Sequence, residues 1–563
     1  MKKLILLLFS FVYLLADVFI LNSKVNIERY KKLQLNIKVY EARLNLLKDY
    51  IASQGESATI IDEKMIHLLQ PGDVLFVIDS FALSKKAQGE IKVFVSNGGI
   101  VVFNFKSGFL DENGEITEKS FLGDITGLKD VGYGTKPGDH DLFFVPRLLS
   151  PISTSKSAKR LDMVVYDTIP IFTGKKPDME WTNWGMTAPL RYNGKYVPSG
   201  NMWDGKFYKG GWIYFSYPFY VFLNGEQVIS DRFKYMVNSL IKYASTGVAV
   251  VKWPFLKYDK MVFVSEDTEY RFAQFSNFIK ALQKYDMNGT AFCVGYLAKE
   301  HPILMQNAGE LKNLEIGSHS YSHTKLIDKT VEQLKNVEIN GNNKLLKTLS
   351  GQTVRGFRPP REEINQKMLN VIDKSTIKYV LTKNLSQLQP RYRGGLLEYS
   401  RLGTDDYSYL VTLDWSKPQI VQRMKEEVDF LTGLNAMYTL STHTHLMNYK
   451  SNVTMLEQFL AYVKQKHYPV LKGIDIAKLI RQRDNIYLDY TPRDTGIVVS
   501  LDNENSNTVK EFIFRVFFLR KPVKFAESQN LNVQLIKYPN ENYVDVKVFN
   551  FKPLTQAKII LRY

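Results

Sequence analysis

The sequence predicts a multidomain α/β protein with an N-terminal α/β domain, a central distorted β/α barrel and a small C-terminal β-sandwich. Three observations predict this. The chain has 563 residues, more than one hydrophobic core usually organises. Its central part contains apolar runs that repeatedly end in ionisable clusters, and its last part changes to short alternating strands. We place the domains at 22–250, 251–484 and 485–563, after a leader at 1–21.

The N-terminus has the pattern of an export signal. Lys2 and Lys3 precede the apolar run 4–16, which is shorter than the about 20 residues of a membrane span but suits a signal sequence. The cleavage site Leu14-Leu15-Ala16 lacks the first of its two small residues. An uncleaved anchor reaching Leu21 therefore stays open beside a cleaved signal. Both alternatives predict a periplasmic or secreted protein that contacts a membrane only through this segment.

The net charge indicates which classes of partner to expect, and the cysteine content shows whether disulfides can stabilise the fold. The net charge is +17, which on an exported protein favours anionic surfaces or acidic glycans. Lysines scattered over solvated faces explain much of this excess. The sequence has no nucleic-acid-binding motif, so nucleic acid is not an expected partner. Cys293 is the only cysteine, so no intrachain disulfide can form, and its apolar surroundings predict a buried, inert thiol.

The segment 22–250 has an alternating α/β pattern. Apolar spacing predicts a helix over 38–53, and apolar runs after turn signals predict buried parallel strands at 73–78 and 100–105. The segment resembles glutamine-amidotransferase-like and flavodoxin-like domains. An amidotransferase needs a cysteine nucleophile, which this segment lacks, so the resemblance implies a fold without that activity. Four tryptophans between Trp181 and Trp212 are expected in a β-rich core, with a sugar-stacking surface as the alternative.

The segment 485–563 has the spacing of a small β-sandwich. Short strands are separated by turns rich in Asn, Pro and Lys, and either glycan binding or packing is open as its role. The predicted strands are Ile497–Leu501, Phe512–Leu519, Val533–Tyr538, Tyr543–Phe549 and Lys558–Tyr563.

In the segment 251–484, apolar runs end in polar clusters. Functional side chains of a parallel β/α barrel collect at the C-terminal ends of its strands. Two of the endings contain four of the eight histidines of the chain. The predicted endings are Ser265-Glu266-Asp267, Ser318 to His323, Arg358-Pro359-Pro360, Asp414-Trp415 after a strand at 409–413, and Ser441 to His445.

One histidine pair has the spacing of metal ligands. Three residues separate His319 from His323, which places both imidazoles on one face of a helix or turn. Asp267 from another strand would complete a set of two histidines and one carboxylate. The alternative is that this spacing is accidental. The acidic strand ending before the pair and the Arg-Pro-Pro ending after it favour the interpretation as metal ligands.

These motifs resemble the polysaccharide deacetylase family, carbohydrate esterase family four, over residues 260–479. The family's Thr-Phe-Asp-Asp motif corresponds to Val264-Ser265-Glu266-Asp267, and its His-Ser/Thr-x-x-His motif to His319–His323. Its Arg-x-Pro motif matches Arg358-Pro359-Pro360. The fourth motif matches only in Asp414-Trp415, and the final histidine motif matches Thr442-His443.

The resemblance implies a hydrolase that removes N-acetyl groups from an amino-sugar polysaccharide, with envelope polysaccharide machinery as a further partner. Glu266 would be the general base, oriented by Arg358. His443 would be the general acid, supported by Asp414. The oxyanion would face a backbone N–H near Arg361. A divalent metal ion, with Zn²⁺ favoured, would be held by Asp267, His319 and His323.

Three of these roles have alternatives. Glu266 stands where the family mostly has Asp, and a positional error of about 1 Å can cost about 100-fold in rate, so Glu269 is a second candidate for the base. His445 is a second candidate for the acid, because alternation places it on the same side of its strand as His443. The alternatives to Asp414 are Asp405 and Asp406.

Two other functions remain compatible with the sequence. One is a non-catalytic glycan-binding or polysaccharide-assembly protein on a deacetylase scaffold. The retention of Asp267, His319 and His323 argues against it. The other is a hydrolase of the same design that acts on an O-acetyl ester or a small amide.

Overall fold

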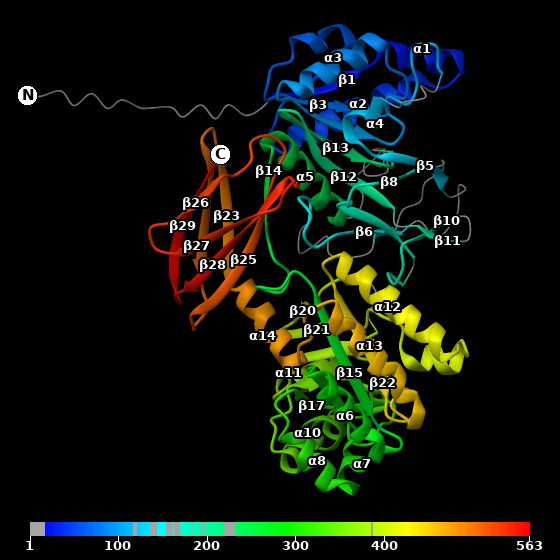
Figure 1. Cartoon of the computed structure of the whole chain (residues 1–563), viewed down its shortest axis with the longest axis vertical. Helices are drawn as coiled ribbons and strands as arrows, with labels where there is room; N and C mark the ends of the chain where they lie inside the picture. Colours follow the sequence, from blue (N-terminus) through cyan, green and yellow to red (C-terminus); the bar gives the residue numbers. More distant parts are fainter. Residues whose placement is uncertain are drawn as a thin grey trace, which may run out of the picture. The chain divides into compact units, whose positions relative to one another are not determined.

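The computed structural model describes most of the chain, and Figure 1 shows its course. The chain divides into two compact units. One unit comprises residues 1–131, 202–249 and 518–522, and the other comprises 132–201, 250–517 and 523–563. The domain boundaries expected at 250 and 484 stay predictions. The described residues are 17–115, 121–134, 143–153, 161–162, 169–183, 185–192, 195–197, 199–218, 231–383 and 387–563.

The first unit is built on a mainly parallel sheet with the strand order β2-β1-β3-β4-β13-β12. Only β12 runs antiparallel to its neighbour β13. The expected helix over 38–53 and both expected parallel strands are confirmed. The strands are β1 (Val18–Asn22), β2 (Ala58–Asp62), β3 (Val74–Val77), β4 (Ile100–Asn104), β12 (Gly200–Phe207) and β13 (Gly210–Phe215), and the helices are α1 (Lys24–Lys32), α2 (Ile37–Ser53), α3 (Lys85–Ser96), α4 (Phe121–Thr126) and α5 (Asp231–Thr246).

Strand β1 occupies the end of the predicted leader. Val18–Leu21 pair with β2 on one side, and Val18–Ile20 also pair with β3 on the other. Ile20 and Leu21 are fully buried, so this strand belongs to the core of the first unit. Residues 1–16 of the predicted leader lie outside the described residues.

The three described tryptophans of the segment 181–212 are core residues. Trp181, Trp203 and Trp212 are each at most 1% exposed, and Trp203 stacks on Tyr214. The core interpretation is therefore confirmed for these three, while Trp184 lies outside the described residues.

The second unit contains an eight-stranded sheet with the order β20-β21-β19-β18-β17-β16-β15-β22. Neighbouring strands of this sheet are parallel except β20 and β21. The strands are β15 (Met261–Thr268), β16 (Gly289–Cys293), β17 (Leu314–Ser318), β18 (Gly356–Phe357), β19 (Tyr379–Thr382), β20 (Arg391–Arg393), β21 (Leu396–Ser400) and β22 (Met437–His443). The helices between and after them are α6 (Phe275–Tyr285), α7 (Gly295–Glu300), α8 (Pro302–Gly309), α10 (Asn340–Ser350), α11 (Gln366–Asp373), α12 (Lys417–Gly433), α13 (Val453–Gln465) and α14 (Gly473–Asp484).

This sheet curls towards a barrel without a closing ladder among the described strands. Single hydrogen bonds link the edge strand β22 to the segments around β21. The N–H of Thr439 donates to the carbonyl of Leu402 at 2.8 Å, and that of Met437 donates to Leu388 at 3.0 Å. The predicted distorted barrel therefore corresponds to an open, curled sheet whose strands end on a common rim.

The C-terminal part is all β. It forms two four-stranded sheets with the orders β14-β25-β28-β27 and β23-β24-β29-β26. All five predicted strands are present, whereas β23 and β26 were not predicted. The strands are β14 (Val248–Lys252), β23 (Ile486–Arg493), β24 (Gly496–Asn503), β25 (Val509–Phe518), β26 (Phe525–Glu527), β27 (Asn532–Lys537), β28 (Tyr543–Phe551) and β29 (Thr555–Arg562).

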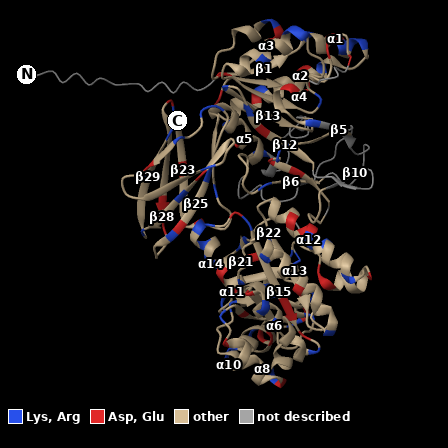
Figure 2. Cartoon of the chain, viewed as in Figure 1, with Lys and Arg blue, Asp and Glu red and all other residues tan. Residues whose placement is uncertain are grey.

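Three further expectations concern membrane contact, charge and the cysteine. None of the helices in the described ranges has the length and apolar character needed to cross a bilayer. Basic and acidic residues are interspersed along the elements in Figure 2, as scattered surface lysines predict. Cys293 is fully buried on β16, and burial raises the pKa of its thiol far above the ordinary value. It is therefore an inert core residue.

Candidate active site

The ends of four strands, β15, β17, β18 and β22, meet at the rim of the curled sheet. Asp267 near the end of β15 is in register with His443 at the end of β22. His319 follows β17, whose last residue Ser318 pairs with Phe357 of β18, directly before Arg358. Neighbouring parallel strands thus bring together residues that lie far apart in the sequence, as expected for this class of sheet.

The carboxylates of β15 face two different environments because successive side chains alternate across a strand. Glu266 accepts a hydrogen bond from Thr268 at 2.9 Å and another from Asn448. It is fully buried, and this burial raises its pKa well above the usual range. Asp267 and Glu269 instead lie beside the histidines. The expected base Glu266 therefore lies away from the cluster.

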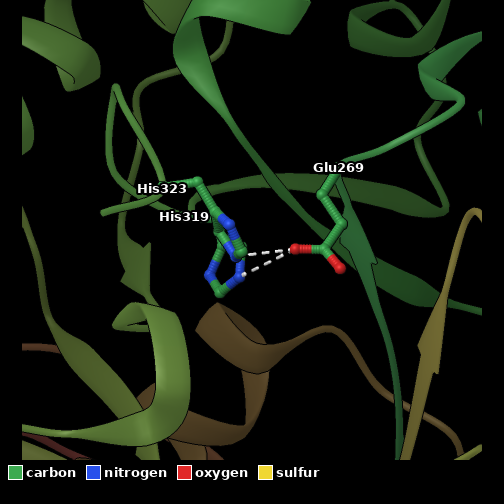
Figure 3. A group of neighbouring side chains, drawn as sticks. All are labelled: Glu269, His319 and His323. Atoms are coloured by element: carbon green, nitrogen blue, oxygen red, sulfur yellow. Dashed lines mark ion pairs between the residues drawn. The ribbon is translucent and has the colours of Figure 1, made fainter. Parts of the chain in front are cut away.

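The group that could hold a metal ion consists of Glu269, His319 and His323, whose ligand atoms all lie within 4.8 Å of one another. Figure 3 shows both imidazoles pointing at one carboxylate oxygen. His323 Nε2 lies 2.7 Å and His319 Nε2 lies 3.8 Å from Glu269 Oε2. Burial alone would raise the pKa of Glu269, but the hydrogen bond from His323 and the nearby imidazoles lower it to about 2. The carboxylate is therefore ionised.

Hydrogen bonds fix the two histidines. His319 Nδ1 lies 2.7 Å from the carbonyl oxygen of Arg358, which directs its Nε2 lone pair at the cluster. His323 lies on a turn, not a helix, with a φ of 54°. Its N–H donates to the Ser320 hydroxyl at 3.0 Å, and Asn342 of α10 donates to the Ser320 carbonyl at 3.0 Å. The turn is thus held from within and from a helix.

Asp267 occupies a different position from the one that the sequence predicts. Its Oδ1 lies 3.1 Å from Arg358 Nη1, while its Oδ2 lies 3.6 Å from His443 Nε2 and 3.8 Å from His319 Nε2. It is outside the Glu269 group. Asp267 therefore lies between a guanidinium and the candidate acid, next to the site of a metal ion.

Arg358 is anchored by a buried ionic network. Only 2% of its surface is exposed, and its Nη2 lies 2.8 Å from Glu362. Glu362 returns to Arg358 through a tight turn in which Arg361 and Glu362 have φ values of 60° and 58°. Arg401, after β21, lies 2.8 Å from Glu362 and 2.5 Å from Asp405. The network compensates the buried guanidinium charge and fixes it against Asp267.

The partner of His443 is Asp406. His443 Nδ1 lies 2.5 Å from Asp406 Oδ1, and the N–H of His443 donates to Oδ2 at 2.8 Å. Burial alone would lower the pKa of His443, but the charge and hydrogen bond of Asp406 raise it to about 10. His443 therefore carries a proton at neutral pH.

The predicted supporting residue Asp414 does not take part. The predicted strand at 409–413 is wrong, because Ser408–Thr412 form a π-helical turn in which Tyr409 is buried while Val411 is exposed. Asp414 follows this turn with a φ of 48° and faces solvent. The pattern mistaken for a strand is an apolar run of a single helical turn, and the adjacent Asp405-Asp406 pair, already an alternative, contains the actual partner.

The two histidines of the last strand ending, His443 and His445, contact different carboxylates. His443 contacts Asp267, whereas His445 Nδ1 lies 3.4 Å from Glu269 Oε1, the carboxylate oxygen that does not face His319 and His323. The ring of Tyr270 meets His445 edge-on at 5.5 Å and is itself 53% exposed. His445 therefore lies on the Glu269 side of the site.

The residues present fit a divalent ion. Two imidazole nitrogens and one carboxylate oxygen are a set that zinc prefers, and three protein ligands leave a position open for water or substrate. The carbonyl bonded to His319 Nδ1 is the outer hydrogen bond that ligating histidines usually make. Both the types of donor atom and the orientation of the His319 ring are therefore compatible with a divalent ion.

Residues 250–380 match the family model described as polysaccharide deacetylase. The matched segment contains β15 to β18 and thus Asp267, Glu269, His319 and Arg358. No curated protein matches the chain.

Solved structures overlap with about two fifths of the chain. A family 4 carbohydrate esterase from Streptomyces lividans in complex with acetate is 18% identical, covering 38% of this chain and 92% of its own with a TM-score of 0.28. The family 4 carbohydrate esterase PdaA of Bacillus subtilis is 19% identical, covering 39% and 82% with a TM-score of 0.31. A family 4 pseudoenzyme from Bacillus anthracis is 16% identical, covering 39% and 65% with a TM-score of 0.30.

Proposed function

We propose that this chain, which contains a polysaccharide deacetylase domain, removes N-acetyl groups from an amino-sugar polysaccharide of the cell envelope or an exopolysaccharide. One observation carries the proposal. The end of β15 presents Asp267 to an arginine and a third histidine, and Glu269, directly after the strand, lies beside two histidines. This arrangement separates a place for a metal ion from a place for proton transfer.

We assign the metal ligands to Glu269, His319 and His323 instead of the expected set with Asp267. Zn²⁺ is the ion that best suits two imidazoles and a carboxylate. A bound divalent ion would polarise the acetyl carbonyl and lower the pKa of a water molecule. Side chains of the protein would accept and donate the protons of the reaction and would hold the reacting groups in place.

Asp267 replaces Glu266 as the proposed general base. It lies beside the ligand group, and the Arg358 guanidinium at 3.1 Å stabilises its ionised form. His443 is the proposed general acid, since Asp406 keeps it protonated and its Nε2 faces Asp267. A proton accepted at Asp267 and a proton donated from His443 Nε2 would serve the two stages of amide hydrolysis.

The test combines metal analysis with acetate release from N-acetylglucosamine oligomers. The unmodified protein is expected to bind a divalent ion and to release acetate, while His319→Ala loses both. Asp414→Asn is a matched control that removes an exposed carboxylate of the same domain. Acetate release that is unchanged in His319→Ala would discard the assigned site. A bound ion without turnover on any acetylated glycan would favour the non-catalytic, glycan-binding alternative.

The bond and the location need separate measurements. Parallel assays on N-acetyl, O-acetyl and small-amide substrates decide whether the amide of a polymer is the preferred target. Fractionation of the producing cell, with mass spectrometry of the mature N-terminus, tests the proposed periplasmic or secreted location. Cleavage within residues 1–16 would fit the signal, since Val18–Leu21 form β1.

A further inference from the structure

The C-terminal sheet β23-β24-β29-β26 carries a groove on its outer face, with a volume of about 1060 Å³. None of its lining residues belongs to the candidate active site. The strands alternate, so that Val499, Leu501 and Ile559 are buried while the residues between them point outwards. The volume of the groove lies just above the range typical of ligand sites, about 300–1,000 Å³.

The register of the strands places an aromatic ring and two carboxylates together. Tyr487 of β23 is opposite Asp502 of β24, which is opposite Gln556 of β29. In the next row of outward residues, Asp489 is opposite Ser500. Gln556 Nε2 donates to Asp502 Oδ2 at 3.1 Å, so the polar groups of the groove are oriented by their neighbours.

The chemistry of this face suits a sugar polymer. Tyr487 is 57% exposed in the groove wall, and a flat aromatic face bordered by polar side chains can pack on the apolar face of a pyranose ring. The amide of Gln556 and the hydroxyl of Ser500 can hydrogen-bond ring substituents. Because the groove runs across several strands, it can accommodate more than one sugar unit.

The charge of the groove selects among sugar polymers. Glu527 and Arg562 neutralise each other in an ion pair of 2.5 Å. This leaves the carboxylates of Asp489 and Asp502 and the amine of Lys558. Within the described ranges neither Asp489 nor Asp502 has an ion-pair partner. The groove is thus acidic overall on a chain whose net charge is +17, and it favours a cationic ligand over an anionic one.

We propose that this groove binds the amine-bearing glycan that deacetylation produces. The inference rests on the proposed function, because removal of an acetyl group converts a neutral amide into an amine that is protonated at neutral pH. Two carboxylates on adjacent strands attract such amines, whereas the acetylated polymer offers them no charge. Binding of the product polymer by a second site would keep the catalytic domain on a chain that it has begun to modify.

The test measures binding of glucosamine and N-acetylglucosamine hexamers to the full-length, metal-loaded Asp267→Asn protein by calorimetry, so that the oligomers are not converted. The glucosamine hexamer is expected to bind about tenfold more tightly, which corresponds to about 1.4 kcal/mol. This preference is expected to shrink at about 1 M salt, where the Debye length falls to about 3 Å.

Two variants address the groove directly. The double change Asp489→Asn with Asp502→Asn is expected to remove the tenfold preference and leave binding of the acetylated hexamer unchanged. Tyr487→Ala is expected to weaken both hexamers by about three- to tenfold, since it removes the stacking surface. Phe525→Ala is the matched aromatic control, because Phe525 is 66% exposed on β26 of the same sheet but does not line the groove. Glu504→Gln with Glu541→Gln is the charge-matched control.

Three results would overturn the inference: equal affinities for the two hexamers, a preference that survives the Asp489→Asn and Asp502→Asn changes, or an equal loss in the Phe525→Ala control. Acetate release by the unmodified protein is measured in parallel. Acetate release without binding of the amine oligomer to the groove would refute the proposed binding site but not the proposed function. Groove binding of the amine oligomer without turnover on any N-acetylated glycan would refute the proposed function and leave the binding site standing.

Discussion

The two sides of the candidate active site are built from one short segment, the end of β15 and the residue that follows it, but they have different partners. On one side, Glu269 meets His319, His323 and His445, and the group offers nitrogen and oxygen donors to a metal ion. On the other side, Asp267 meets Arg358 and His443, and charged partners replace metal donors. Residues two apart on a strand point the same way about 7 Å apart. In the proposed mechanism, a shift of two positions therefore separates a metal ligand, Glu269, from a general base, Asp267.

The largest effect should come from the metal side. Glu269→Ala is expected to lose the bound ion and to lower kcat/KM by about 10,000-fold, because the several kcal/mol of stabilisation from the ion are lost. Metal content and acetate release measured on the same preparation check this. Full metal content in Glu269→Ala would show that Glu269 is not a ligand of the ion.

The second effect belongs to the proton-transfer side. Asp267→Asn is expected to lower kcat by about 1,000-fold, within the range for loss of a general base, while the protein keeps its metal ion. Asp267→Asn is thus expected to lose rate but not metal, whereas Glu269→Ala is expected to lose both. Loss of the ion in Asp267→Asn would instead restore the ligand role that the sequence predicts for Asp267.

The third effect is a change in pH dependence. Asp406 raises the pKa of His443 to about 10, so the acid stays protonated below that pH and is lost as the pH rises through it. In Asp406→Asn the pKa should fall towards its ordinary value, which moves the alkaline limb of the kcat profile to lower pH and reduces the rate about 100-fold at neutral pH. Asp414→Asn is the control and should leave the profile in place.

The fourth effect is on metal affinity alone. His445 borders the carboxylate oxygen of Glu269 that faces away from His319 and His323. Removal of such an outer partner typically weakens metal binding by about 10- to 100-fold, so His445→Ala should raise the metal dissociation constant near the lower end of that range. A competition titration with a chelator measures it. If His445→Ala shifts the alkaline limb while metal affinity stays the same, His445 belongs to the proton-transfer side.

The smallest effect is expected at Glu266. Its side chain faces Thr268 and Asn448 on the other face of β15, and burial raises its pKa. Glu266→Gln preserves the shape and removes a group that is already disposed to be neutral, so kcat should change by less than about threefold, well short of the about 100- to 10,000-fold contribution of general acid–base catalysis. A loss comparable to that of Asp267→Asn would return the base role to Glu266.

Local sequence patterns were sufficient to predict the α/β class of the central domain and the strand ends that form the candidate site. Apolar runs followed by His319–His323, Arg358 and His443 identified the strand ends, because buried parallel strands and ligand spacing are local patterns that adjacent residues encode. The same local logic predicted α2, β3, β4 and five C-terminal strands. It failed at 409–413, since a short apolar run is equally compatible with one helical turn.

Which carboxylate contacts which histidine or arginine became visible only in the tertiary structure. Asp267 and Glu269 both follow the same apolar run, and their roles depend on Arg358, His319 and His443, which reach them from other strands. Asp406 pairs with His443 across 37 residues of sequence, and no local pattern distinguishes it from Asp405 or Asp414. Charge pairing acts over a few ångströms, so it depends on which segments the fold brings together. Apolar runs and ligand spacing, in contrast, can be recognised in the order of the residues along the chain.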